Sequence, residues 1–486
     1  MARSFEPYDA ESFRALGRAL VDRLADYLTT CDEAEPGPDS SLPVLAVTAP
    51  AELEAAWSAT LSAAPEGPPA ERALALLDAL LEHSNHLHHP GYVGHQIAPP
   101  LPTAALFELV GSLLNNGMAV YEMGQLQTVL ERRCLEWFAE RLGFPESSGG
   151  LMTSGGSLGN LTALLAARQA QTGNWDVGSH GEPPLAVMVS ADSHYCIARA
   201  VQVMGWGAEG VVKVPVDADH RMRTELLPEL HDAATAKGRR VIAVVASSCS
   251  TATGAFDDLE AIADFCSARE LWLHVDGAHG ASHALSEKHR DVLRGIERAD
   301  SVVWDAHKLA LVPALITAVL FRDARHAART FAQEASYLFE DDMAAYDVGH
   351  RTLECTKRGL GTTLYAALHA HGTQVFTDNV DRLVDLAQAF AELLERSADF
   401  ELAVSPRTNI VCFRHVPTGF EGDLDPLQER LRRAVVDSGA FYLVQTRLAE
   451  GQFLRTTLMN PRTSIEVLEA LLGTLRASAA AELRID

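Results

Sequence analysis

Between about residues 101 and 330, the chain alternates between short, continuously apolar runs and segments whose apolar residues have helical spacing. Continuous apolar strands separated by helices are typical of an α/β fold, in which a largely parallel sheet is covered on both faces. The predicted strands are 185–191, 241–247, 271–276, 301–304 and 315–321. The predicted helices include 125–142, 157–171, 194–204, 225–237 and 257–269. Because ligands of such sheets bind beyond the carboxyl ends of the strands, the residues that follow each strand are candidates for a site.

The two ends of the chain have a different pattern. Helical spacing at 8–30, 51–63 and 70–84, interrupted by a Pro-, Asp-, Ser- and Gly-rich stretch at 32–50, predicts a helical N-terminal segment. This segment has little core of its own, so we expect it to pack against something larger, such as a partner subunit; a flexible tail is the alternative. A long helix at about 360–396 precedes a C-terminal region with predicted strands 408–414, 441–446 and 452–459 and helices 424–438 and 463–482. We therefore predict three parts: an N-terminal helical segment that packs on the partner subunit (1–100), a large domain (101–360) and a small α+β domain (361–486).

Composition excludes some functions. With 486 residues, the chain is too long for one small core. Its 40 basic and 65 acidic residues give a net charge of −25, which argues against binding to nucleic acid or to an anionic membrane. The seven cysteines contain no CxxC pair, so they predict reduced thiols rather than a disulfide framework or a zinc site. The N-terminus has no apolar signal segment, and no apolar run approaches the roughly 18 residues of a membrane span, so we expect a soluble, cytoplasmic protein.

A lysine and an aspartate at two strand ends carry the strongest chemical signal. Lys308 follows the apolar run 301–304 and precedes another apolar stretch, a pattern that favours burial. A desolvated lysine loses its proton easily and forms a Schiff base with an aldehyde. Asp276 ends the apolar run 271–276. A lysine that holds the aldehyde and an aspartate that keeps the pyridine nitrogen protonated are what pyridoxal phosphate requires.

The segment 153–160, Thr-Ser-Gly-Gly-Ser-Leu-Gly-Asn, opens a predicted helix. Gly155 and Gly156 let the backbone approach an anion, and the helix N-terminus offers unpaired N–H groups and the positive end of a dipole. Ser157 adds a hydroxyl group. Glycine–serine turns before helices are also common without a ligand, so this segment alone only suggests a phosphate site.

Two other strand ends carry polar side chains. His194 follows the strand 185–191, where an imidazole suits stacking on a pyridine ring or proton donation; an ordinary, partly buried histidine is the alternative. The hydroxyl-rich stretch 247–254, which includes Thr251, suits a phenolic oxygen or a carboxylate, or forms a simple polar turn. Cys249 has no identifiable partner for a nucleophilic role.

A histidine-rich stretch contains five histidines: His83, His86, His88, His89 and His95. Their spacing does not match the i, i+4 pair of a zinc-protease helix, so we predict no metal site there. We expect these residues to line the mouth of an active site instead.

Taken together, these motifs resemble those of the pyridoxal-phosphate-dependent group II amino-acid decarboxylases, which include the glutamate, cysteine-sulfinate and aromatic amino-acid decarboxylases. The resemblance runs from about His89 to about Arg462. Its most specific parts are His-Val-Asp-Gly-Ala at 274–278, Trp-Asp-Ala-His-Lys at 304–308 and the turn at 153–161. The segments 118–123 and 453–461 resemble the branch of the family that acts on acidic substrates.

The resemblance implies an aspartate-aminotransferase-like fold (fold type I), pyridoxal 5′-phosphate as cofactor and a homodimer with active sites at the subunit interface. It implies that Lys308 forms the Schiff base, that Asp276 binds the pyridine nitrogen and that His194 stacks on the ring. The implied cofactor-binding residues are Gly155, Gly156, Ser157, His194, Thr251, Asp276, Ala278, Asp305, His307 and Lys308.

The resemblance also implies residues for the substrate. Arg455 would pair with the α-carboxylate, which suits a bidentate guanidinium. His95 lies in the region where members of the acidic branch read the distal acid group. The segment 340–350 resembles the mobile catalytic loop, and its only tyrosine, Tyr346, is the candidate proton donor; a structural tyrosine is the alternative.

The expected reaction is decarboxylation of an L-amino acid to the amine and CO₂. The alternatives on the same fold are decarboxylation coupled to oxidative deamination, which yields an aldehyde, transamination, and Cα–C bond formation. A scaffold without cofactor is disfavoured because Lys308, Asp276 and His194 are all present, and an NAD enzyme because no GxGxxG follows an early strand. Acidic, aromatic and small aliphatic substrates stay open, with the acidic class favoured by the segments named above.

Overall fold

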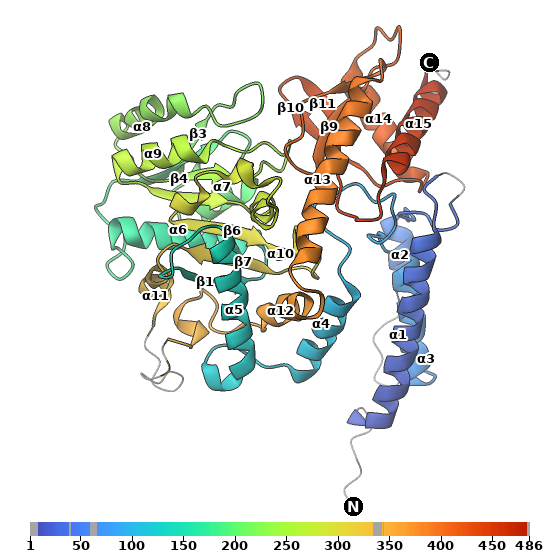
Figure 1. The fold of residues 1–486 in the computed structure, drawn as a ribbon, viewed down its shortest axis with the longest axis horizontal. Helices are drawn as coiled ribbons and strands as arrows, with labels where there is room; N and C mark the ends of the chain where they lie inside the picture. Colours follow the sequence, from blue (N-terminus) through green and yellow to red (C-terminus); the bar gives the residue numbers. More distant parts are fainter. Residues whose placement is uncertain (1–7, 38–39, 59–65, 334–342, 344, 484–486) are drawn as a thin grey trace, which may run out of the picture. The chain divides into compact units, whose positions relative to one another are not determined.

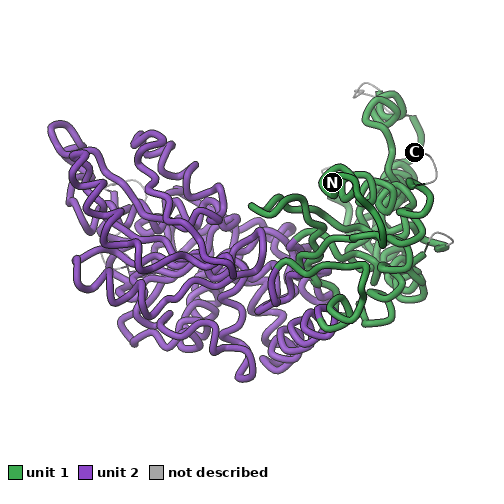
Figure 2. Tube along the Cα trace, turned by 90° about the horizontal axis from the view of Figure 1, so that it is seen from above, with its two compact units in different colours: residues 1–95, 392–403, 412–486 green, residues 96–391, 404–411 purple. Residues whose placement is uncertain are grey.

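The computed structural model describes residues 8–37, 40–58, 66–333, 343 and 345–483. The chain forms two compact units (Figure 2). Unit 1 comprises 1–95, 392–403 and 412–486, and unit 2 comprises 96–391 and 404–411. None of the helices in the described ranges combines the length and the apolar character that a bilayer crossing requires.

Unit 2 is built on a seven-stranded sheet with the order β1-β7-β6-β5-β4-β2-β3 (Figure 1). The strands are β1 (Gly149–Thr153), β2 (Leu185–Ser190), β3 (Val211–Val214), β4 (Arg240–Ser247), β5 (Trp272–Asp276), β6 (Ser301–Asp305) and β7 (Thr317–Phe321). The four pairs from β3 to β6 are parallel. The largely parallel sheet is therefore confirmed.

One strand runs against the others. β7 pairs antiparallel with both β6 and β1. The connection from β6 to β7, residues 306–316, contains only the single helical turn α10 (Ala306–Leu309). A parallel return needs a crossover of a dozen or more residues, so this short connection brings the chain back in the opposite direction.

Helices cover the sheet because its strands are apolar along their whole length; every residue of β2, β5, β6 and β7 is buried. Residues of α6 and α7 join the central strands in one apolar cluster that includes Leu164, Ile197, Val187 and Ile242. Besides α10 and the first two helices after residue 359, unit 2 contains α4 (Pro102–Leu114), α5 (Gln125–Arg141), α6 (Gly156–Thr172), α7 (Tyr195–Val203), α8 (Leu227–Ala236), α9 (Leu259–Arg269) and α11 (Arg325–Phe331).

The predicted single helix at 360–396 is wrong. The chain forms α12 (Leu360–His371) and α13 (Gln374–Glu395) instead. Gly372 has φ of 72°, a left-handed conformation that glycine adopts readily, and its N–H bonds to the carbonyl of Leu368 at the end of α12. The sequence reading also missed α4, β1 and β3.

Unit 1 combines the N-terminal helices with the C-terminal region. The helices are α1 (Ala10–Glu33), α2 (Pro50–Ala56), α3 (Pro69–Glu82), α14 (Leu424–Asp437) and α15 (Ile465–Glu482). A four-stranded sheet has the order β10-β11-β9-β8, with β8 (Phe400–Leu402), β9 (Ile410–His415), β10 (Val444–Leu448) and β11 (Gly451–Thr457). The small C-terminal α+β region expected from the sequence is therefore present.

Candidate active site

A cavity of about 250 Å³ opens at the carboxyl ends of the strands in unit 2. It lies where β6, β5, β4 and β2 are neighbours, so the residues that follow these strands meet there. All of the predicted cofactor-binding residues line it: Gly155, Gly156, Ser157, His194, Thr251, Asp276, Ala278, Asp305, His307 and Lys308. Lys308 and Asp276, which come from different strand ends, thus border one space.

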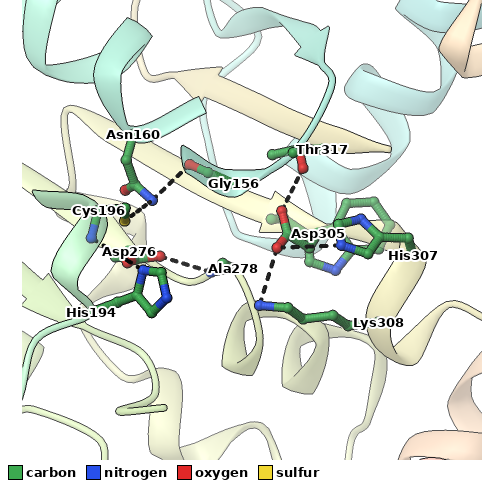
Figure 3. A network of polar contacts seen from close by, with 12 residues as sticks. Gly156, Asn160, His194, Cys196, Asp276, Ala278, Asp305, His307, Lys308 and Thr317 are labelled. Carbon is green, nitrogen blue, oxygen red and sulfur yellow. Dashed lines mark hydrogen bonds and ion pairs between the residues drawn. The ribbon is translucent and has the colours of Figure 1, made fainter. Parts of the chain in front are cut away.

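Lys308 lies on the one-turn helix α10, directly after β6, and its side chain is only 15% exposed. Its Nζ is 3.1 Å from Oδ2 of Asp305, the last residue of β6 (Figure 3). The other oxygen of this buried carboxylate accepts a hydrogen bond from Thr317 Oγ1 on β7. The amine of Lys308 is therefore held by a carboxylate that is itself fixed by the antiparallel strand.

Asp276 ends β5, and its Oδ1 accepts a hydrogen bond from the backbone N–H of Ala278 over 3.3 Å. Its carboxylate lies beside His194 (Figure 3). Burial lowers the pKa of His194, and the charge of Asp276 offsets this only in part. The Nδ1 atom of His194 accepts a hydrogen bond from the backbone N–H of Cys196 over 3.3 Å, so the neutral imidazole carries its proton on Nε2.

The turn before α6 suits an anion. Gly155 has φ of +110°, which favours glycine, and no side chain caps the helix at that position. A Cβ atom on Gly156 would lie 3.0 and 3.1 Å from the two carboxylate oxygens of Asp305, so a larger residue does not fit there without movement. The first N–H groups of α6 are therefore available to a phosphate group.

These groups fit one kind of ligand. The cavity brings together an amine that can hold an aldehyde, a carboxylate that can accept a hydrogen bond from a protonated ring nitrogen, an imidazole, and a helix N-terminus for a phosphate. This donor set matches pyridoxal 5′-phosphate, the cofactor that the sequence predicted.

Three predicted residues are not among the described lining residues of this cavity. Tyr346 is absent from the described lining of the cavity; its ring lies 5.4 Å from that of Tyr121 and beneath the guanidinium of Arg132. The predicted loop at 340–350 lies partly outside the described residues, at 340–342 and 344. Arg455 on β11 and His95 belong to unit 1, whereas the cavity belongs to unit 2. Their roles stay predictions.

The sequence reading missed several residues of the lining: Gln96, Ser154, Asn160, Cys196, His279 and Leu315. A signal existed for Asn160, which lies four residues after Gly156 and therefore on the same side of α6. Gln96 follows His95 in the region that the resemblance assigned to the distal acid group, whereas Leu315 comes from a segment without a pattern that points to this site.

The histidine-rich stretch is part of unit 1. His86 Nδ1 lies 3.2 Å from the hydroxyl of Tyr27 on α1, and the rings of His86 and His88 lie against the same tyrosine. Burial lowers the pKa of His88 and of His89 to about 4. These histidines are therefore neutral at pH 7, and within the described ranges no group of three His, Cys, Asp or Glu has the arrangement of a metal site.

Unit 2 has a larger cavity of about 400 Å³, bordered by Phe256 and three arginines. Each arginine already pairs with a carboxylate: Arg221 with Asp219 at 2.8 Å, Arg294 with Glu260 at 4.0 Å, and Arg407 with Asp291 at 3.0 Å. The described lining of this larger cavity contains no lysine that could hold an aldehyde. The smaller cavity is therefore the better candidate for the active site.

Comparison with known proteins agrees with this geometry. The model of the pyridoxal-dependent decarboxylase conserved domain matches residues 83–416. The chain is 31% identical to cysteine sulfinic acid decarboxylase of Rattus norvegicus over 84% of this chain and 86% of that protein. It is 28% identical to aromatic-L-amino-acid decarboxylase of Bacillus atrophaeus over 81% and 82% of the two chains. The crystal structure of mouse CSAD in apo form superposes with a TM-score of 0.89, at 28% identity, covering 97% of this chain and 99% of that chain.

Proposed function

Since this chain belongs to the pyridoxal-dependent decarboxylase family and is a carboxy-lyase that uses pyridoxal 5′-phosphate, we propose that it converts an L-amino acid to its amine and CO₂. The reaction takes place in the cavity of unit 2, where Lys308 holds the cofactor. The observation that carries this proposal is that Lys308, Asp276 and the N-terminus of α6 border one cavity.

The bound cofactor supplies an electron-accepting ring for the electron pair that remains when CO₂ leaves. Asp276 accepts a hydrogen bond from the protonated ring nitrogen and so keeps the ring electron-poor. Lys308 provides the amine for the aldehyde, and Asp305 positions that amine through the contact of 3.1 Å. Pre-positioned charges of this kind act strongly because the cavity walls are buried.

The remaining cavity residues orient the ligand. Gly155, Gly156, Ser157 and His307 bind the phosphate group in this proposal. The Nδ1 atom of His307 lies 3.0 Å from the carbonyl oxygen of Ile316, and Ile316 N lies 3.2 Å from the same Nδ1, which fixes the ring in place. The other ring contacts in the proposal are made by Thr251 and Ala278, and by His194, whose ring stacks on the pyridine.

We assign the substrate's α-carboxylate to Arg455 and its distal group to the region of His95. Within unit 1, burial and then the charge of Arg455 lower the pKa of His95. The ring of His95 lies 5.8 Å from that of Tyr442, which stacks on Tyr92. This aromatic and cationic group suits an amino acid with a distal acid, and an acidic substrate is the class that we favour.

Tyr346 stays our candidate for the proton donor to the substrate carbon. If it does not act, oxygen can intercept the carbanion and the reaction yields an aldehyde, ammonia and peroxide. We therefore keep this aldehyde-forming reaction as the alternative that the first experiment must distinguish.

We also propose a homodimer with active sites at the subunit interface. Its support is the apolar outer face of α4, where six large side chains are at least 39% exposed: Leu106, Phe107, Leu109, Val110, Leu113 and Leu114. The division at 1–100, 101–360 and 361–486, the packing of the N-terminal segment on the partner subunit and the cytoplasmic location stay predictions.

The test is a panel of acidic, aromatic and small aliphatic L-amino acids given to the purified protein with pyridoxal 5′-phosphate. We expect one substrate class to release CO₂ and the amine in equal amounts. Lys308→Ala should lose both the products and the absorbance band of the attached cofactor. Aldehyde, ammonia and peroxide in place of the amine would contradict the proposal, as would a wild-type protein that shows no cofactor band.

A further inference from the structure

Behind the cavity, a chain of buried hydrogen bonds joins β6, β5 and α6. We propose that His274 and Asn160 form a positioning pair that holds the phosphate turn, Gly155–Ser157, in place against β5. This inference rests on the proposed function, because it assigns the turn to the cofactor's phosphate group. The motif at 274–278 does not by itself assign a role to His274, and the turn at 153–161 does not by itself assign one to Asn160.

The contacts form one continuous path. Trp272 Nε1 is 2.8 Å from Ser301 Oγ, which is 2.9 Å from His274 Nδ1. His274 Nε2 is 2.7 Å from Asn160 Oδ1, and Asn160 Nδ2 is 2.9 Å from the carbonyl oxygen of Gly156. All four side chains are at most 3% exposed, so water does not compete for these bonds.

The two ends of this path and the neutral state of His274 together determine the direction of its bonds. The indole N–H of Trp272 can only donate, and the carbonyl of Gly156 can only accept. The amide nitrogen of Asn160 therefore faces Gly156, and its oxygen must accept from His274 Nε2–H. A neutral His274 then accepts a hydrogen bond at Nδ1 from the hydroxyl group of Ser301. Burial lowers the pKa of His274 to about 4, which keeps it neutral at pH 7.

The pair links the proposed cofactor contacts. His274 lies two residues before Asp276 on β5, and Asn160 holds Gly156, which is the first residue of α6 and the middle residue of the turn. The second hydrogen of the Asn160 amide points to Cys196 Sγ, 3.5 Å away on α7, whose N-cap is His194 (Figure 3). A buried polar group that loses its hydrogen-bond partner raises the free energy of the folded protein. Each bond of the path therefore restricts the orientation of the next side chain.

If His274 cannot donate, the Asn160 amide loses the group that orients it and the carbonyl of Gly156 loses a fixed partner. The phosphate turn should then be less ordered, while Lys308 and Asp276 stay unchanged. The expected consequence is a loss of affinity that depends on the phosphate group of the ligand.

The test compares pyridoxal 5′-phosphate with pyridoxal, which lacks the phosphate, by absorbance titration of the apo-protein. His274→Phe keeps a buried ring without a donor, and should weaken binding of the phosphorylated ligand on the order of tenfold, with a much smaller change for pyridoxal. His274→Gln, which can still donate to Asn160, should restore much of the difference. Ile242→Val, a purely apolar change in β4, is the control for loss of packing.

Ser301→Ala removes the hydroxyl that donates to Nδ1 of His274 and so supports the tautomer with its proton on Nε2. This variant should show a weaker form of the same phosphate-dependent loss if His274→Phe does not fold. Equal weakening of both ligands, no weakening, or a His274→Gln protein that behaves like His274→Phe would overturn the inference. A wild-type protein that binds neither ligand would instead overturn the proposed function, so the two failures are distinguishable.

Discussion

At the scale of single residues, the candidate site is a set of charged groups, and the sequence predicted some of their positions. The sequence predicted Asp276, Lys308 and the glycine turn as neighbours, and all of them border one cavity. It did not predict that Asp305 contacts the Lys308 amine and also lies against Gly156. This carboxylate therefore places a negative charge beside the turn that we assign to phosphate.

Asp305→Asn removes this charge and keeps the shape of the side chain. Because two anions repel each other in a buried site, we expect the variant to bind inorganic phosphate more tightly, on the order of tenfold, in an isothermal titration of the apo-protein. Asp323→Asn, which removes a carboxylate outside the cavity, should have no such effect. Weaker phosphate binding by Asp305→Asn would show that the carboxylate assists the anion instead.

The buried histidines predict how stability depends on pH. Burial lowers the pKa of His274 and of His283 to about 4, whereas an unfolded chain protonates histidine near 6.5. Between these values the unfolded state binds more protons, so the free energy of unfolding should fall as the pH is lowered, by up to about 1.4 kcal/mol per pH unit for each such histidine.

Urea unfolding at pH 6.5, 5.5 and 4.5 measures this dependence. His283→Gln should reduce the slope, and His180→Gln, a change at an exposed position, should leave it unaltered. A wild-type stability that stays constant over this range would refute the argument.

At the scale of secondary-structure elements, a buried ion pair connects parts that are distant in the chain. Lys357 Nζ, in the segment before α12, lies 2.7 Å from Oε1 of Glu131 on α5, and both side chains are at most 4% exposed. The same carboxylate oxygen accepts the backbone N–H of Met152 on β1 over 3.1 Å. The carboxylate of Glu131 therefore joins α5 to the edge strand β1 and to the segment that precedes α12.

Removal of one partner leaves the other charge buried without compensation. We expect Glu131→Gln or Lys357→Met to lower the free energy of unfolding by about 3 kcal/mol, as measured by urea unfolding. The double variant Glu131→Gln/Lys357→Met should lose less than the sum of the single changes, because it buries no unpaired charge. Strictly additive losses would contradict this coupling.

At the scale of the whole molecule, the apolar outer face of α4 is the feature that a monomer does not explain, since contiguous exposed apolar side chains mark interaction sites. The side chains of Leu109 and Leu113, four residues apart on this helix, are 49% and 65% exposed. A second copy of the chain is the occupant that we propose.

Leu113→Glu places a charge on this face and should shift the dimer toward monomer in light scattering at micromolar concentration. Because the proposed active sites lie at the interface, decarboxylation should fall together with the dimer fraction. Val177→Glu, which changes an apolar residue that is 81% exposed outside α4, is the matched control. A wild-type protein that is already monomeric and active would contradict the proposal.

The sequence by itself determined the alternation of strands and helices in unit 2 and the strand ends at which Asp276, His194 and Lys308 lie, because periodicity and local turn chemistry are encoded within short segments. Only the tertiary structure decided the reversed direction of β7, the pairing of Glu131 with Lys357, and the contact between His274 and Asn160, which are separated by 114 positions in the chain. These features depend on which distant segments pack together, and that choice follows from burial and hydrogen-bond satisfaction over the whole domain rather than from any local pattern.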